Sequence, residues 1–306
     1  MIFNRKNTFL KFPWLKNKNL PMVISADYDG LICASFLNHF LNWELVGFYD
    51  LNKIWLSQKA INNKNDLIWV DLNILPQQGK AIGGHIVSID DNIPKGFESS
   101  CNPNILANIN AKKFESKFPF STLIYLLWLH NKQIPKDNLS KFLILHSDAT
   151  WLKYQNYPEN CSNWQNKMSD FKWEQLFKNI SSKKFEKDID QNFYPLLKSL
   201  GAISSTSKLT SKNLNIKSRQ LQFNPDWDED IILNLFSLFA ENLKWSIPKL
   251  PDIVRLIEGS RKKVDLSVIK TIGLNSFIKK NKVFSYAISS PRILNFTTFK
   301  LSSFSK

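Results

Sequence analysis

Short apolar runs alternate with stretches of helical periodicity along the first half of the chain. Between the first two runs, residues 31–43 place apolar side chains at helical spacing. The runs with the length and composition of buried strands are 21–27, 44–50, 66–72 and 85–90. Strands that alternate with helices favour right-handed crossovers and a mostly parallel sheet. The pattern therefore predicts a doubly wound α/β domain, whose ligand crevice lies at the carboxyl ends of its strands.

Aspartates stand at the ends of predicted strands and helices in this region. The set is Asp27, Asp29, Asp71, Asp90 or Asp91, and Asp148. For any one of them the simpler role is to cap a turn or the next helix, because Asx side chains bond to backbone amides there. Capping does not require so many such residues in one α/β unit. The set therefore predicts carboxylates that share one crevice.

The alternation of apolar runs and helical stretches becomes less regular after Trp151, and turn-forming residues are frequent at 156–170. The other predicted elements are buried helices at 118–131 and 138–146, a loop at 204–218, helices at 228–244 and 250–272, and apolar, β-branched segments at 283–299. The sequence thus predicts an α/β domain at residues 1–155 and a second, smaller basic α+β domain at residues 156–306.

The formal net charge is +15. Residues 1–150 carry 16 Lys and Arg against 12 Asp and Glu, a net +4, and residues 151–306 carry 25 against 14, a net +11. A solvated basic surface is one explanation, because Lys and Asn are abundant throughout. The clustering of Arg261, Lys262 and Lys263 favours a second one, in which the cations bind the phosphates of a polyanion.

The composition argues against several classes of protein. No run of eighteen apolar residues occurs, so we expect no transmembrane span. The first residues do not resemble a secretory signal, and a cytoplasmic location follows as the simplest expectation. Cys33, Cys101 and Cys161 are too few and too widely spaced for a disulfide framework or a metal clip, so we expect them to be reduced and buried.

Carboxylates are hard ligands suited to Mg²⁺ or Mn²⁺, and two such ions form a clamp for in-line attack on phosphorus. Asp27 and Asp29 could each face a different ion, because Gly30 lets the chain bend sharply into the next helix. Asp71, at the end of another strand, could bridge the two ions. The sequence therefore predicts a site for two Mn²⁺ or Mg²⁺ ions.

Five short motifs resemble those of the DHH phosphoesterase superfamily, which includes RecJ-like exonucleases and nanoRNases. Asp27-Tyr28-Asp29-Gly30 looks like the first motif, and Asp71 in IWVDLN looks like the lone bridging aspartate. The name-giving Asp-His-His would fall at Asp90-Asp91-Asn92, followed by a similar Asn-Pro at Asn102-Pro103-Asn104, and Asp148 would be the fourth-motif aspartate. The resemblance covers residues 20–150 and implies metal ligation by Asp27, Asp29, Asp71, Asp90, Asp91 and Asp148.

The same resemblance implies catalytic roles for Asp71, Asp91 and Asn92, and substrate contacts for Asn92, Asn102 and Asn104. Both signature histidines are missing, however, and Ser25 stands where a histidine often precedes the first motif. Asn92 can donate a hydrogen bond to a phosphate oxygen but cannot carry the proton of an imidazole. Loss of catalysis is therefore a real alternative.

Two histidines need separate consideration. His85 begins the predicted strand that ends at Asp90, which puts it at the far end from the crevice and favours a structural role. His146 precedes Asp148 by two residues, so it is either a helix-end residue or a ligand or proton donor of the site.

The leading hypothesis is a two-metal phosphodiesterase that acts on single-stranded DNA or RNA or on short oligonucleotides, with Arg261, Lys262 and Lys263 binding the substrate. The rival is a catalytically degenerate DHH-fold scaffold that binds nucleic acid or a protein partner. A third hypothesis is hydrolysis of a small nucleotide or pyrophosphate, for which an extended basic face is not needed. No membrane partner is expected, and the sequence leaves the oligomeric state open.

Overall fold

The computed structural model describes residues 3–75, 79–91, 93–180, 182–201, 225, 229–290 and 292–299. The predicted loop at 204–218 and Asn92 lie outside these residues. The chain forms two compact units that are interleaved in sequence and do not follow a linear boundary at residue 155. The first contains residues 1–25, 41–118 and 249–306, and the second contains residues 26–40 and 119–248.

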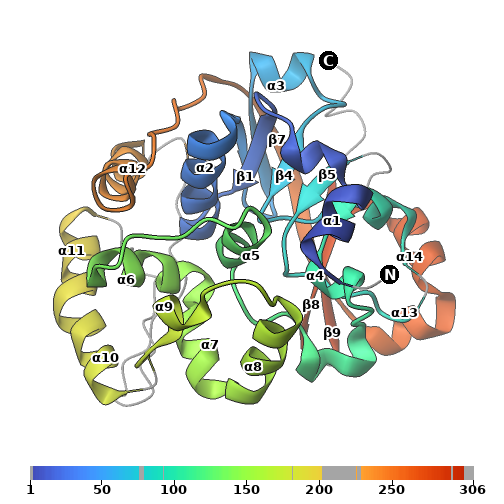
Figure 1. Ribbon diagram of the computed structural model, residues 1–306. Coiled ribbons are helices and arrows are strands. Elements are labelled where there is room, and N and C mark those ends of the chain that lie inside the picture. The colour runs from blue at the N-terminus through green and yellow to red at the C-terminus, as the bar shows by residue number, and fades with distance from the viewer. Residues whose placement is uncertain are drawn as a thin grey trace. The chain divides into compact units, whose positions relative to one another are not determined.

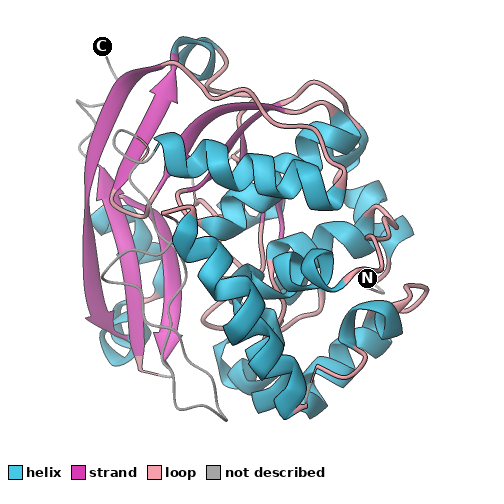
Figure 2. Ribbon diagram, turned by 90° about the vertical axis from the view of Figure 1, so that its left-hand side faces the viewer, coloured by secondary structure: helices cyan, strands magenta, loops and turns pink. Residues whose placement is uncertain are grey.

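The first unit contains one nine-stranded sheet with the order β6-β5-β4-β1-β2-β3-β7-β9-β8, which Figures 1 and 2 show as arrows. Its strands are β1 (Pro21–Ser25), β2 (Glu44–Tyr49), β3 (Lys53–Ser57), β4 (Ile68–Val70), β5 (Lys80–Ile82), β6 (Ser100–Cys101), β7 (Ile253–Asp265), β8 (Val283–Ser290) and β9 (Ile293–Phe299). Pairing is parallel from β6 through β2 and antiparallel from β2 through β8. The α/β class is confirmed, but the sheet is mixed rather than mostly parallel.

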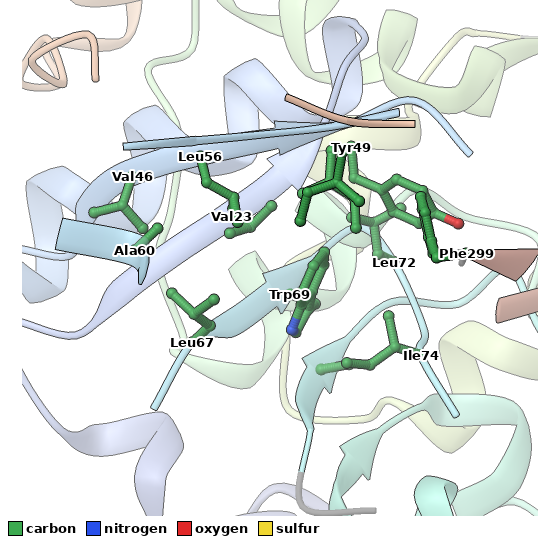
Figure 3. Close-up of a cluster of buried hydrophobic side chains, with 13 residues drawn as sticks. Val23, Val46, Tyr49, Leu56, Ala60, Leu67, Trp69, Leu72, Ile74 and Phe299 are labelled. Carbon is green, nitrogen blue, oxygen red and sulfur yellow. The ribbon is translucent and has the colours of Figure 1, made fainter. Parts of the chain in front are cut away.

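The burial of the central strands agrees with their apolar sequences. All five residues of β1 and all three of β4 are buried, as continuous apolar runs predict for parallel strands covered on both faces. Figure 3 shows one cluster of buried side chains from this sheet, in which Tyr49, Leu72 and Phe299 gather at one end. Trp69 packs in the same cluster, with its ring 5.9 Å from that of Tyr49. The cluster therefore joins the central strands to β9 at the end of the chain.

Residues 85–90, predicted as a strand, are irregular apart from one bridge between Ser88 and Asn110. The strand lies earlier, at β5, and stops before Gly83-Gly84. A Cβ on Gly84 would lie 2.5 Å from the ring of Phe118, so only glycine allows this close approach. The glycine pair thus ends a strand instead of preceding one.

Residues 250–272, predicted as a helix, are mostly strand. β7 pairs with β3 through its first half and with β9 through its second half, and a helix, α13 (Leu266–Ile272), begins only afterwards. Partners distant in sequence override the local helical pattern here. The segments at 283–299 form β8 and β9.

The other helical segments of the first unit are α1 (Arg5–Lys11), η1 (Pro13–Lys16), α3 (Gln58–Asn62), η2 (Lys95–Ser99), α4 (Pro103–Leu106), η3 (Ala111–Ser116) and α14 (Leu274–Asn281). Among the described residues, none of the helices combines the length and apolarity that a membrane crossing needs. Cys33, Cys101 and Cys161 are free and buried, as expected.

The second unit is helical in its described residues. It contains α2 (Tyr28–Leu41) up to Phe40, α5 (Thr122–Leu129), α6 (Asn138–His146), η4 (Ser147–Ala149), α7 (Thr150–Asn156), α8 (Pro158–Lys167), α9 (Trp173–Phe177), α10 (Lys183–Asp188), the π-helix η5 (Ile189–Phe193), α11 (Tyr194–Ser199) and α12 (Glu229–Leu243). The helices predicted at 118–131, 138–146 and 228–244 are confirmed. Ser121 caps α5 and Asp137 caps α6 through their side-chain oxygens.

Truncating Trp69 to alanine should destabilise the protein by about 3–5 kcal/mol, because the ring contacts Tyr49 and also Phe284 of β8 in the buried cluster. Chemical denaturation measures the free energy of unfolding. The control is Val254→Ala on β7, where the side chain is exposed and the expected change is below about 0.5 kcal/mol. Equal losses in the two variants would contradict this packing.

Candidate metal centre

Parallel pairing aligns the ends of β1 and β4. Ile24 lies beside Val70, so the chain leaves both strands at the same edge of the sheet. Asp71 follows Val70 directly and adopts the left-handed conformation, with φ of 62°. Apart from glycine, aspartate is one of the few residues that adopt the left-handed region readily. The turn buries the Asp71 side chain instead of directing it to solvent.

Both carboxylate oxygens of Asp71 have close partners in the first unit. The Ser25 hydroxyl donates to Oδ2 at 2.8 Å, and Nε2 of His85 lies 2.9 Å from Oδ1. A buried carboxylate needs such partners, since leaving its charge uncompensated would be costly. The two contacts hold the Asp71 side chain in one orientation.

His85 is a site residue that sequence reasoning placed wrongly. It was expected at the far end of a strand, but β5 ends at Ile82, and the glycine pair brings His85 to the same edge as Asp71. The available signal was the short segment Lys80–Ile82, with two apolar residues, before the two glycines. A three-residue strand is too short to stand out from its surroundings in a periodicity argument.

Asp27 and Asp29 lie at the start of α2. The Asp27 Oδ1 accepts a hydrogen bond from the Gly30 amide at 3.0 Å, which is the capping role that the simpler interpretation predicts. Asp29, in the first turn of the helix, is only 1% exposed and accepts a hydrogen bond from the backbone amide of Asp148 at 2.8 Å. The helix N-terminus favours both negative charges.

Asp27, Asp29 and Asp71 each offer one carboxylate oxygen, and these three atoms all lie within 4.8 Å of one another. Three carboxylates at this separation repel one another unless a cation or protons compensate their charge. An all-oxygen donor set of this kind suits a hard divalent cation such as Mg²⁺ or Mn²⁺. The acidic triad could therefore bind a metal ion.

Asp148 was expected to be a metal ligand through its carboxylate, but it does not belong to this triad. Its backbone amide contacts Asp29, and its own carboxylate forms an ion pair with Lys153. Asp148 and the following Ala149 are both left-handed, each with φ of 49°. For alanine this conformation is strained, at a cost of roughly 1–2 kcal/mol. Such local strain is common where a fold positions functional groups.

Asp90 and Asp91 are not part of the triad either. Because β5 ends at Ile82 and residues 85–90 form no strand, Asp90 and Asp91 do not follow a strand end as expected. Asp91 is exposed and accepts a hydrogen bond from the Asn110 side chain at 2.8 Å. Within the described part of the chain, no group of three possible metal ligands includes either residue. Their expected metal roles, and a catalytic role for Asp91, receive no support from this geometry.

Asn102 and Asn104 were expected to contact substrate, yet both side chains are fully buried. The Asn104 amide donates to the carbonyls of Gly84 and Ile86, and its oxygen accepts from the Phe118 amide. The Asn102 amide donates to Ile86 O and to Asn73 Oδ1. These bonds clamp the residues on either side of His85. The asparagines therefore hold the chain around the site and are not accessible to a substrate.

His146 is a buried helix-end residue. Its ring centroid lies 4.7 Å from that of Tyr28, and it also contacts Phe193 and Tyr194. Burial lowers the pKa of His146 to about 4. The imidazole is therefore neutral at physiological pH and cannot act as a proton donor there in its charged form.

Arg261, Lys262 and Lys263 lie in the second half of β7 and are exposed. They pair with Thr297, Phe296 and Asn295 of β9. Because side chains alternate along a strand, Arg261 and Lys263 point to one face of the sheet and Lys262 to the other. The three cations thus form no single row, although each is accessible to a phosphate.

The sequence matches no protein-family model, and comparisons with curated proteins and with solved structures find no match.

Replacing Asn104 by alanine should destabilise the protein by about 2–4 kcal/mol, because it leaves two buried carbonyls and one buried amide without this partner. Urea denaturation measures the loss. Asn62→Ala removes an exposed amide from α3 and should cost below about 0.5 kcal/mol. A stability of Asn104→Ala within error of this control would show that the clamp is not needed.

Proposed function

We propose that the chain is a metal-dependent phosphodiesterase that cuts single-stranded nucleic acid or short oligonucleotides, with a site of the DHH phosphoesterase type. The acidic triad of Asp27, Asp29 and Asp71 carries the proposal. The five parallel strands β6-β5-β4-β1-β2 support it, since the triad includes the residue that directly follows β4. Ligand sites in α/β sheets occupy this position.

Asp27, Asp29 and Asp71 would hold the ion, for which Mn²⁺ or Mg²⁺ fits the donor set. A bound ion of this kind lowers the pKa of a coordinated water and neutralises charge on a phosphoryl oxygen, so no protein nucleophile is required. Ser25 and His85 fix the Asp71 carboxylate through both of its oxygens. Such supporting hydrogen bonds commonly raise metal affinity 10- to 100-fold.

His85 also supports an active enzyme over a degenerate one. The sequence lacks the two histidines of the Asp-His-His signature at residues 90–92. The structure has one at 2.9 Å from Asp71, from a different position in the chain. An imidazole there can orient the carboxylate of a metal ligand.

The proposed substrate class rests on charge. The second half of the chain has a net charge of +11, and Arg261, Lys262 and Lys263 are exposed on β7. Cations of this kind neutralise nucleic-acid phosphates and make binding sensitive to salt. A small nucleotide or pyrophosphate would not need a basic surface of this extent.

The rival proposal is a catalytically degenerate scaffold of the same fold that binds nucleic acid or a protein partner. The ion pair between Asp148 and Lys153 favours it, because the pair occupies the fourth carboxylate that a two-ion site would use. A scaffold would bind single strands in a salt-dependent way without hydrolysing them in any metal.

Asp71→Asn should lower Mn²⁺-dependent cleavage of an end-labelled single-stranded oligonucleotide by at least about 100-fold, because it removes the charge of the central ligand while keeping the side-chain shape. Asp66→Asn is the matched control, since Asp66 precedes β4 and forms an exposed ion pair with Lys80. That variant should cleave at the normal rate. Unchanged turnover in Asp71→Asn would refute the mechanism, and wild-type protein that binds but never cleaves would favour the scaffold.

A further inference from the structure

Lys153 and Asp148 form an ion pair within the second unit, which holds the Lys153 ammonium group against the Asp148 carboxylate. Nζ of Lys153 contacts Oδ2 of Asp148, and the two side chains are 34% and 11% exposed. Asp148 is in turn attached to Asp29 through its backbone amide, at 2.8 Å from Oδ2. The lysine is thus linked through one residue to a member of the acidic triad.

The local structure explains why the two side chains meet. The left-handed turn at Asp148 and Ala149 joins α6 to α7, and the Thr150 hydroxyl donates to the Ser147 carbonyl at 2.8 Å. Lys153 lies about one turn into α7. Helical side chains lean toward the N-terminus of their helix, so Lys153 reaches back to Asp148.

The pair limits what Asp148 can do. A carboxylate in contact with an ammonium group gains little from a second cation on the same oxygen, because the two positive charges repel each other. The partial burial of the pair reduces solvent screening and strengthens this repulsion. A metal ion would therefore have to displace Lys153 to use Asp148 as a ligand.

We propose that Lys153 takes the place of a second metal ion, so that the site binds one divalent cation at Asp27, Asp29 and Asp71. The inference rests on the proposed function and changes its stoichiometry from the two ions that the motifs implied to one. An ammonium group has three N–H donors, and one of them serves Asp148. The others allow Lys153 to donate charge-assisted hydrogen bonds to the scissile phosphate of the substrate.

The test counts Mn²⁺ ions on the full-length chain by equilibrium dialysis, with calorimetric titration as a second method. The wild-type protein should bind one ion. Lys153→Met leaves the Asp148 carboxylate without its cation, so this variant should bind two ions. Adding Asp148→Asn to Lys153→Met should return the count to one.

Lys141→Met is the matched control. Lys141 lies on α6 in the same unit and donates to a backbone carbonyl instead of a carboxylate, so its loss should leave the count at one. Cleavage supplies a second readout. At a Mn²⁺ concentration that fills only the first ion site, Lys153→Met should lower kcat/KM for an oligonucleotide at least about tenfold. Lys153→Arg should restore part of this loss, because it keeps the charge.

The ion counts distinguish failure of this inference from failure of the proposed function. Two ions on the wild type, reduced to one by Asp148→Asn, would overturn the inference and leave the phosphodiesterase proposal standing. This measurement does not depend on the folding of any Lys153 variant. One ion on Lys153→Met as well would also overturn the inference. No ion on the wild type would overturn the proposed function and this inference with it.

Discussion

The parallel pairing of β1 with β4 is the interaction on which the candidate site depends. It aligns Ile24 with Val70, so that the two segments leaving these strands start from the same edge of the sheet. Side chains alternate along a strand, and a slip of one residue in the register would reverse the face to which each side chain points. Both strands are buried along their whole length, which opposes such a slip. Burial of both strands therefore helps to fix the position of Asp71 at this edge of the sheet.

The site also depends on compensation of the negative charge of its carboxylates. The fold places negative groups at a helix N-terminus and at a strand end, where water is largely excluded. It supplies compensation of three kinds, namely backbone amides, the neutral hydroxyl of Ser25, and basic groups from His85 and Lys153. Protein positive charge and metal charge are interchangeable in this role to first order. In the proposed site, the number of metal ions would then depend on how much positive charge the chain already provides.

The elements that could be predicted from sequence are those with strong local signals. The apolar runs at 21–27 and 66–72 located β1 and β4, and helical patterns located α5, α6 and α12. β5 has only three residues, so the strand was predicted at 85–90 instead and His85 was misplaced. β7 resembled a helix because its strand character depends on β3 and β9, which are distant in sequence. The pairing of Asp148 with Lys153 requires two left-handed residues that no sequence pattern indicated.

The pairing of β3 with β7 has a consequence for how the chain folds as it is made. β3 is complete early in synthesis, but its edge that pairs with β7 lacks this partner until residues up to Glu258 have emerged. Until then a nascent chain exposes an open strand edge next to apolar side chains, which is the kind of surface that pairs with other chains. β7 thus protects the edge of β3 within the same chain. A chain truncated before β7 would lack this cover and be prone to aggregate.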